Sequence, residues 1–252
     1  MIIEGLKLTL RNAGIIVFPI ISILVLYFFI AGALITSVPI SKINKINESS
    51  KNFTAYVQKV EKKIYNYVEK NFKKVALTFI LFGIFAFIFS EFFNASMIVA
   101  ARDIVFTGKF SFKEAFDGGF VYTLPLIGVD ILCGFGFIAF LMPFYVAYIL
   151  TRSKIILNAL PVVLIFVAPF LITPRYVVVV KNKSVLDSIV DGVKIAIRNY
   201  LLAFTSVVFC SIISMISILI PIIYPIVSAF SASLLSVYMC LIVGGENVES
   251  LR

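Results

Sequence analysis

The apolar residues of this chain are gathered into six long blocks that are separated by short polar segments. The blocks cover, approximately, residues 13–38, 75–100, 121–148, 156–178, 200–220 and 223–243. A helix needs roughly 20 apolar residues to cross about 30 Å of hydrocarbon, and each block is near or above that length. A transmembrane β-barrel would instead show short segments in which apolar and polar residues alternate. The pattern therefore predicts an all-α, polytopic membrane protein with six transmembrane helices in a single membrane domain, residues 1–252.

Two segments that precede apolar blocks repeat nearly the same pattern. EGLKLTLRN (residues 4–12) comes before the first block, and DGVKIAIRN (residues 191–199) ends a longer segment, 184–199, before the fifth. Apolar residues recur at helical spacing in both, and acids precede bases, which matches the helix dipole. We expect both to be amphipathic helices that lie in the membrane interface, with Ser184 as the N-cap of the second. Their charged residues are Glu4, Lys7 and Arg11 in the first helix and Asp187, Asp191, Lys194 and Arg198 in the second.

A weaker third copy lies in the middle of the chain. At a constant offset of 73 residues, Arg102 corresponds to Arg175, Ser111 to Ser184, Glu114 to Asp187 and Gly119 to Gly192. We therefore predict three parallel helical-hairpin repeats, at about 1–100, 110–178 and 184–245, in which Arg102 and Arg175 are equivalent basic ends. The alternative is that any interface helix ahead of a span would be amphipathic and end in bases.

The segment between the first two blocks is rich in lysine. Residues 41–74 contain nine lysines, and neither glycine nor proline occurs from position 41 to position 82. Apolar residues recur at helical spacing from position 53, so we expect a helix that starts there and runs into the second block. This extension is either a solvated basic face or a site for anionic lipid or an acidic protein partner. Nucleic-acid binding is not expected, because no recognition motif accompanies the charge.

The distribution of basic residues favours cytoplasmic N- and C-termini in a multi-pass protein of the cell membrane. On this assignment most basic residues of the short flanks lie on the cytoplasmic side, and the opposite short flanks hold only Arg152 and Lys154. Residues 41–74 oppose the rule. We treat them as a folded extracytoplasmic element, to which the rule for short flanks does not apply.

Two acidic residues lie inside apolar blocks, Glu91 in FSEFFNAS and Asp130 in IGVDILCG. Glu91 is eleven residues before Arg102 and Asp130 eleven residues after Gly119. At about 1.5 Å per residue, both are predicted to lie roughly 15 Å below the cytoplasmic surface. A charge there costs at least ~2.5–3.5 kcal/mol, so both acids should face the interior of the bundle. Glu91, Asn94 on the same helix face, and Asp130 thus form a candidate substrate, cation or proton site; alternatively, both acids are protonated and help the helices to pack.

The composition argues against an enzyme. The chain is 61% apolar and 14% charged and has no histidine, and its three cysteines lie singly within apolar runs. No nucleophile motif, phosphate loop or metal-ligand spacing is present, so we expect no catalytic residues, metal or cofactor. The predicted function is non-enzymatic: binding or passing a small molecule, ion or lipid through the polar site. The alternative is a structural or assembly protein whose basic extension recruits a partner or anionic lipid; the oligomeric state is left open.

The passage FLITPRYVVVVKNKSVLDSIVDGVKIAIRNYLLAF resembles a pattern in prokaryotic six-span membrane proteins of unknown function. These include uncharacterised archaeal proteins and the membrane domain found beside some glycerophosphodiester phosphodiesterases. In them a span ends in a short basic turn, which is followed by an amphipathic helix and the next span. The resemblance covers residues 95–245, excludes the lysine-rich segment, and implies an all-helical membrane protein without transferring any catalytic residue. The abundance of isoleucine and lysine is compatible with an archaeal source.

Overall fold

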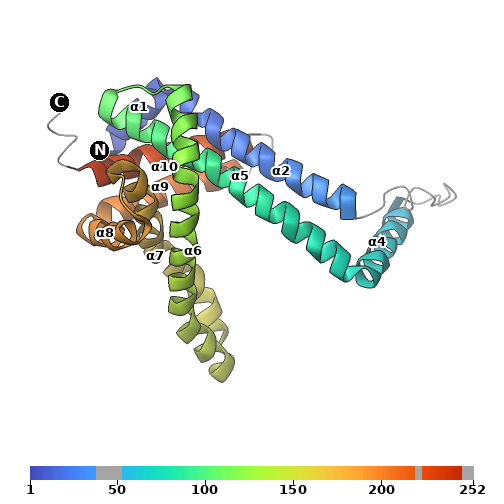
Figure 1. Cartoon of the computed structure of the whole chain (residues 1–252). Helices are drawn as coiled ribbons and strands as arrows, with labels where there is room; N and C mark the ends of the chain where they lie inside the picture. The colour runs from blue at the N-terminus through green and yellow to red at the C-terminus, as the bar shows by residue number, and fades with distance from the viewer. Residues whose placement is uncertain (38–52, 219–222, 246–252) are drawn as a thin grey trace. The chain divides into compact units, whose positions relative to one another are not determined.

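The computed structural model describes residues 1–37, 53–218 and 223–245, and all regular structure within these ranges is helical (Figure 1). The elements are α1 (Ile2–Arg11), the 3₁₀ helix η1 (Ala13–Ile16), α2 (Val17–Ser37), α4 (Phe53–Lys70), α5 (Phe72–Thr107), α6 (Phe112–Thr151), α7 (Lys154–Lys181), α8 (Val185–Arg198), α9 (Tyr200–Ile218) and α10 (Tyr224–Gly244). The all-helical prediction is confirmed.

Five of the six predicted spans correspond to helices that are long and apolar enough to cross a membrane. They are Ala13–Ser37, Phe72–Thr107, Phe112–Thr151, Lys154–Lys181 and Tyr224–Gly244. The remaining one, predicted at 200–220, corresponds to α9. It passes the same test only when it is joined to α8, from which it departs at an angle of 92°. The described residues therefore contain five candidate spans, or six if this bent pair is one span.

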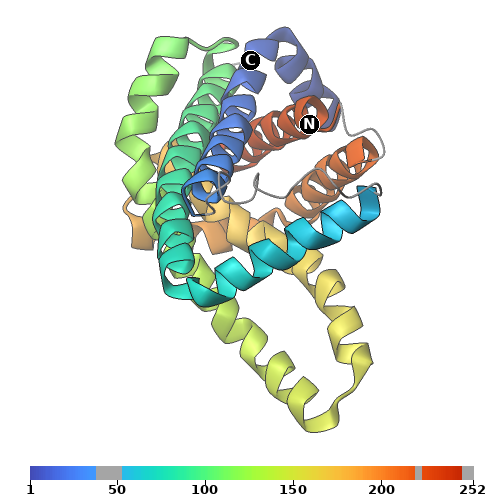
Figure 2. The same ribbon diagram turned by 90° about the vertical axis from the view of Figure 1, so that its right-hand side faces the viewer.

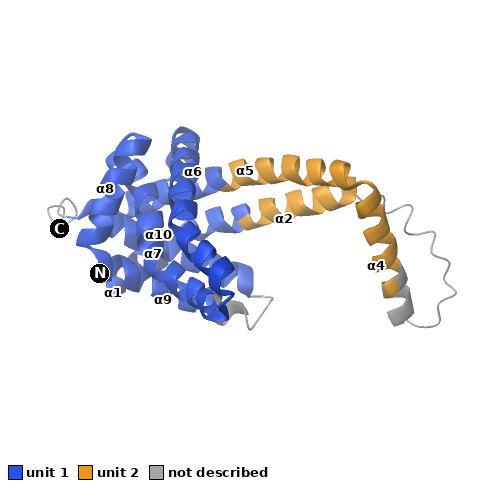
Figure 3. Ribbon diagram, turned by 90° about the horizontal axis from the view of Figure 1, so that it is seen from below, with its two compact units in different colours: residues 1–22, 91–252 blue, residues 23–90 orange. Residues whose placement is uncertain are grey.

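The chain forms two compact units, which Figure 3 colours separately. Unit 1 consists of Met1–Ser22 and Glu91–Arg252, and unit 2 is Ile23–Ser90. The long helices α2 and α5 each contribute residues to both units.

In unit 1, α10 is the most deeply buried of the long helices. It packs against α9, α7 and α1, and Figure 2 shows α9 and α10 as a pair beside the α6–α7 hairpin. The helices α10 and α9 pack closely where their side chains are small. At one such contact, the hydroxyl of Ser231 donates to the carbonyl oxygen of Cys210 on α9 at 2.6 Å. The hydroxyls of Ser236 and Tyr176 on α7 are 3.1 Å apart. The polar groups at these contacts thus have partners without water, as a helix in lipid requires.

The helix α8 has the features predicted for an interface helix. The Ser184 hydroxyl accepts a hydrogen bond from the backbone N–H of Asp187 at 3.3 Å, which confirms it as the N-cap. At the other end, Asn199 separates α8 from α9, and the chain turns through 92° there. The Asn199 side chain donates to the carbonyl oxygen of Ile195 at 3.3 Å, which satisfies one of the last carbonyls of the helix.

The apolar stripes of α8 and α1 are only partly covered by the rest of unit 1. On α8 the buried residues are the small ones, Ser188, Gly192 and Ala196, whereas Leu186 and Ile197 are 68% and 63% exposed. On α1 the buried residues are Gly5 and Thr9, and the apolar residues Ile3 and Leu10 are exposed. Each helix therefore keeps an apolar face that can be covered by lipid.

The middle copy differs from the prediction, because it contains no separate interface helix. Residues 112–151 form one continuous helix, α6, although Pro125 and Pro143 lie within it. In α1 and α8 an asparagine, Asn12 or Asn199, caps the helix with its side chain. The residue at the corresponding offset is Leu126, whose apolar and fully buried side chain offers no such bond.

In unit 2, the C-terminal part of α2 packs against the N-terminal part of α5 through aromatic rings. The Phe29 ring lies 6.1 Å from that of Phe82 and 5.7 Å from that of Phe89. The lysine-rich helix α4 begins at residue 53, as predicted, but it does not run unbroken into the second span. The helix is interrupted at Asn71, whose side chain donates to the carbonyl oxygen of Tyr67 at 2.9 Å. Residues 41–52 of the predicted extension lie outside the described residues.

Candidate functional site

The two acids predicted inside the membrane both belong to unit 1 and lie close together. Glu91 is on α5 and only 5% exposed, and one of its carboxylate oxygens accepts a hydrogen bond from the Asn94 side chain at 3.0 Å. Asp130 is on α6, with a side chain that is 22% exposed. The structure thus brings all three residues of the proposed polar site, Glu91, Asn94 and Asp130, to one place.

The residue that joins them is Arg175 on α7. Its Nη2 atom donates to Oε2 of Glu91 at 2.6 Å, and its Nε atom lies 3.5 Å from Oδ1 of Asp130. Because one planar guanidinium reaches both carboxylates, the two acids lie at the same level of the bundle. Three helices, α5, α6 and α7, each supply one charged group.

Buried apolar residues lie close in sequence to two members of this charged triad, which consists of Glu91, Asp130 and Arg175. Val129, next to Asp130, and Val177, two residues after Arg175, are fully buried. On α7, the buried Thr173 hydroxyl donates to the carbonyl oxygen of Pro169 at 2.6 Å, so it has a partner within its own helix. The Glu91 side chain is only 6% exposed, so its contacts with Arg175 and Asn94 must replace most of its interaction with water.

The triad has unequal numbers of acids and bases. When all three groups are ionised, two carboxylates face one guanidinium, and the sum of the charges is −1. The Glu91–Arg175 contact is the shorter one and the more buried. The contact between Asp130 and Arg175 is longer, and Asp130 is more exposed. Arg175 therefore compensates the charge of Asp130 less than that of Glu91.

The other predicted charged residues are not part of this site. Arg102, predicted to be equivalent to Arg175, bonds instead to its sequence neighbour Asp103, at 3.0 Å from Nε and 2.8 Å from Nη2. On α8, Asp191 is paired with the Lys183 ammonium and lies 4.0 Å from that of Lys194. The remaining predicted interface charges, Glu4, Lys7, Arg11, Asp187 and Arg198, belong to α1 and α8, which are not the helices that carry the triad.

Arg175 was assigned from the sequence to a basic flank, so its role at the triad was missed. The signal that could have identified it is the run YVVVV between Arg175 and Lys181. Five consecutive apolar or aromatic residues after a base indicate that the base lies inside the span and needs a partner there.

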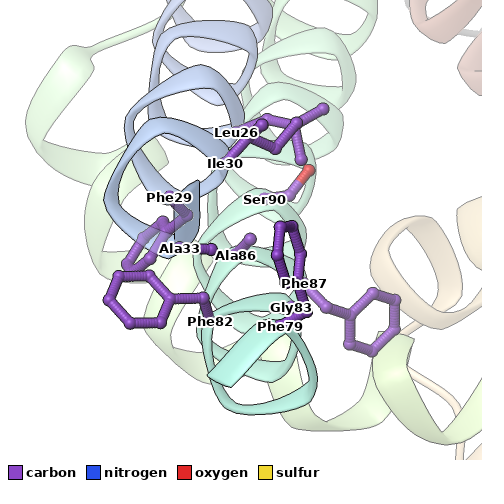
Figure 4. Close-up of a pocket in the computed structure, with 10 residues that line it drawn as sticks. All are labelled: Leu26, Phe29, Ile30, Ala33, Phe79, Phe82, Gly83, Ala86, Phe87 and Ser90. Carbon is purple, nitrogen blue, oxygen red and sulfur yellow. The ribbon is translucent and has the colours of Figure 1, made fainter. Parts of the chain in front are cut away.

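The possible metal ligands and the grooves of the described residues also bear on function. Within the described ranges, no cluster of three or more histidine, cysteine, aspartate or glutamate side chains could hold a metal ion. In unit 2, an apolar groove of about 270 Å³ lies between α2 and α5, lined by phenylalanines and small residues (Figure 4). A second groove of about 270 Å³ lies within the α6–α7 hairpin, between residues 138 and 160.

Comparison of this chain with protein families, with curated proteins and with solved structures gives no match. Function must therefore be inferred from the side chains and the geometry described above.

Proposed function

We propose that this protein is a non-enzymatic, polytopic membrane protein that binds or passes a small molecule, ion or lipid at the site formed by Glu91, Arg175 and Asp130. The observation that carries the proposal is that one guanidinium contacts carboxylates from two other helices, within a group of long apolar helices. Charged residues inside a membrane are costly and mark ligand or ion pathways. A proton or a small cation is the favoured ligand, because the triad carries a surplus negative charge when all its groups are ionised.

The three residues have different roles in this proposal. Glu91 is nearly buried and holds Arg175 at 2.6 Å, so this pair is the fixed part of the site. Asp130 is more exposed and lies 3.5 Å from the guanidinium, so it is the group that a proton or cation reaches. Binding of the proton or cation to Asp130 would weaken the attraction between Asp130 and Arg175. The contact between α6 and α7 would change as a result.

The proposal is tested by reconstituting the full chain in liposomes and measuring uptake of protons, Na⁺ and K⁺ with fluorescent indicators. Asp130→Asn should abolish the flux of the transported ion or its binding, and Glu91→Gln should reduce it. Arg102→Gln is the matched control, because Arg102 bonds within its own helix. If wild type carries a flux that is unchanged in Asp130→Asn and Glu91→Gln, these residues do not line the pathway. If wild type neither carries nor binds any of these ions, the preference for a cation is wrong.

The architecture proposed for this function is three parallel repeats, with both termini cytoplasmic in the cell membrane. Local geometry at the ends of α1 and α8 supports equivalence of the first and third repeats. Asn12 and Asn199 have similar backbone angles, φ −117°, ψ 44° and φ −113°, ψ 27°. Each side-chain amide donates to the carbonyl oxygen four residues earlier, at 3.0 Å for Asn12 and 3.3 Å for Asn199.

Three glycines at corresponding positions support inclusion of the middle repeat. A β-carbon at Gly5 would lie 2.2 Å from the Tyr238 ring on α10, and one at Gly119 would lie 2.1 Å from the Ser96 hydroxyl on α5. One at Gly192 would lie 2.7 Å from Pro174 on α7. Each of these helices thus packs closely against the last helix of the preceding repeat, and the first repeat packs against the third, as expected for a closed ring.

Hydrogen bonds next to these glycines repeat as well. The hydroxyl of Thr9 donates to the carbonyl oxygen of Gly5 at 2.8 Å, and that of Thr123 to the carbonyl oxygen of Gly119 at 2.6 Å. The third position is Ala196, which is buried and has no hydroxyl.

The resemblance to prokaryotic six-span membrane proteins, archaeal ones included, is part of the same proposal, because those proteins also place an amphipathic helix between two spans.

A second candidate function is that of a structural or assembly protein that acts through α4. The observation that favours it is that three lysines of this helix, Lys62, Lys63 and Lys70, are exposed. Deletion of residues 53–70 should then abolish co-purification of an acidic protein partner while ion binding at the triad persists. Retention of the partner after this deletion would count against the assembly role.

A further inference from the structure

The apolar groove of unit 2 lies along the seam between two helices. On α5 it is lined by residues from 79 to 90 at intervals of three and four, and on α2 by residues from 26 to 33. Phe29 and Phe82 stand on one side of it and Phe79 and Phe87 on the other, around the small residue Gly83 (Figure 4). The lining is apolar except for Ser90, so it suits a chain of methylene groups.

The length of the groove fits one leaflet of a membrane. Eleven residues of α5 separate Phe79 from Ser90, which is about 16 Å at 1.5 Å per residue. Half of a hydrocarbon core of about 30 Å is about 15 Å. An acyl chain that lies in the groove would therefore reach from the membrane surface to its middle.

Lysines stand at the end of the groove where a headgroup would be. Lys70, Lys73 and Lys74 are exposed, and Lys74 is five residues, about 8 Å, before Phe79 on the same helix. None of the three ammonium groups is paired with a carboxylate among the described residues. Residues 53–74 contain six lysines and two glutamates, so the local charge is strongly positive.

We propose that unit 2 is a binding site for an anionic glycerophospholipid, with one acyl chain in the α2–α5 groove and the phosphate headgroup at Lys70, Lys73 and Lys74. The apolar groove and the lysines together select this ligand, because an acidic protein segment would satisfy the lysines and leave the groove unfilled. A zwitterionic lipid would fill the groove without a net charge to attract it. The site lies wholly in unit 2 and is independent of the Glu91–Arg175–Asp130 triad in unit 1.

Two variants separate the parts of this site. Changing Lys70, Lys73 and Lys74 to glutamine removes the charge, and Gly83→Leu fills the groove. A β-carbon at Gly83 has no neighbouring atom within 4 Å, so the leucine side chain starts in open space. Gly136→Leu on α6 is the matched control, because Gly136 is also exposed, has equally open surroundings and does not line the groove.

The experiment is native mass spectrometry of the delipidated full chain, titrated with phosphatidylglycerol or phosphatidylcholine that carry the same acyl chains. Wild type should bind phosphatidylglycerol on the order of 100-fold more tightly, since each of the three lysines contributes about 1 kcal/mol, or about 5-fold, near a membrane surface. The lysine variant should bind both lipids within about 2-fold of each other, and Gly83→Leu should lose the high-affinity lipid that Gly136→Leu retains. Equal binding of the two lipids by wild type, or equal phosphatidylglycerol binding by Gly83→Leu and Gly136→Leu, would overturn the proposal. Circular-dichroism melting of each variant checks that it is folded.

Discussion

The guanidinium of Arg175 lies 2.6 Å from the carboxylate of Glu91, 84 residues earlier in the chain. The pair joins α7 to α5, and the 3.5 Å contact from Arg175 to Asp130 adds α6. Glu91 has a side chain that is 6% exposed, so most of its interaction with water has been replaced by this pair and by Asn94. A carboxylate in such surroundings depends on its partner, because a buried charge without compensation is strongly destabilising.

Arg175→Gln should therefore destabilise the protein by about 3 kcal/mol, because it leaves the nearly buried Glu91 carboxyl group without its cation partner. Adding Glu91→Gln to this variant should restore much of the lost stability, since two amides can bond to each other. The measurement is the free energy of unfolding in detergent for the two single variants and the double variant.

Arg102→Gln is the matched control for this cycle, because it removes an arginine whose ion pair is with its own sequence neighbour, Asp103. It should cost less than about 1 kcal/mol. Equal destabilisation by Arg102→Gln and Arg175→Gln, with no recovery in the double variant, would show that the Glu91–Arg175 pair has no special structural role.

The close contact between Gly192 and Pro174 predicts that adding one methyl group at position 192 strongly lowers the free energy of unfolding. A β-carbon at Gly192 would lie 2.7 Å from the Cα atom of Pro174, and backbone cannot move aside as a side chain can. Gly192→Ala should thus lower the free energy of unfolding by about 1–3 kcal/mol. Gly136→Ala, on an open and exposed helix surface, should raise it by up to about 1 kcal/mol through helix propensity. The prediction is wrong if both variants shift the melting temperature in the same direction.

Removal of the Ser188 hydroxyl, unlike the Gly192→Ala change, should raise the free energy of unfolding. Ser188 is fully buried on α8, and its Oγ atom has no hydrogen-bond partner among the described residues. Ser188→Ala should stabilise the protein by about 1 kcal/mol, since it removes a desolvated polar group without opening a large cavity. Ser231→Ala is the control: its hydroxyl donates to Cys210, and its loss should cost about 1 kcal/mol. A loss of stability for Ser188→Ala equal to that of Ser231→Ala would indicate that Ser188 has a partner in solution.

Much of the helical architecture could be predicted from the sequence, because it follows from local patterns. Long apolar runs predict spans, and acids followed by bases around a serine cap predict α8. The small buried face of α8, with Gly192 against Pro174, could not be predicted in this way, because it depends on which helix lies beside it. The apolar face of α8 was predicted correctly, but the structure adds that Leu186, Val190 and Ile197 on it are left exposed by the chain itself.

The site was only half predictable for the same reason. Glu91 and Asp130 are conspicuous as acids within apolar blocks, so their burial follows from composition. Arg175 lies near the end of its block, where a base is common, and only the arrangement of three helices brings it to the acids. Pairing across α5, α6 and α7 is a tertiary relationship, and no local pattern in one sequence specifies it.

The ion pair between Lys183 and Asp191 predicts a dependence of stability on acid pH. The hydrogen bond from the Lys183 ammonium lowers the pKa of the Asp191 carboxyl below its ordinary value of 3.8. A lowered pKa means that the pair stabilises the folded state above about pH 4 and that this contribution is lost as the pH falls through the lower, folded-state value. Asp191→Asn should therefore destabilise the protein at pH 6 but have less effect at pH 3. Asp117→Asn, an exposed acid on α6 that is in no ion pair among the described residues, should show no such difference between the two pH values.

If α1 and α8 are equivalent interface helices on one side of the membrane, Lys7 and Lys194 must face the same compartment. Both side chains are exposed, so a cysteine at either position can react with a label. In a background in which Cys133, the least buried native cysteine, is changed to serine, Lys7→Cys and Lys194→Cys should react with a membrane-impermeant maleimide from the same side of sealed vesicles. Lys70→Cys, at the end of α4, should react from the opposite side, because one span separates it from α1. Labelling of Lys7→Cys and Lys194→Cys from opposite sides would contradict the parallel repeats and leave the matched caps at Asn12 and Asn199 as local similarities only.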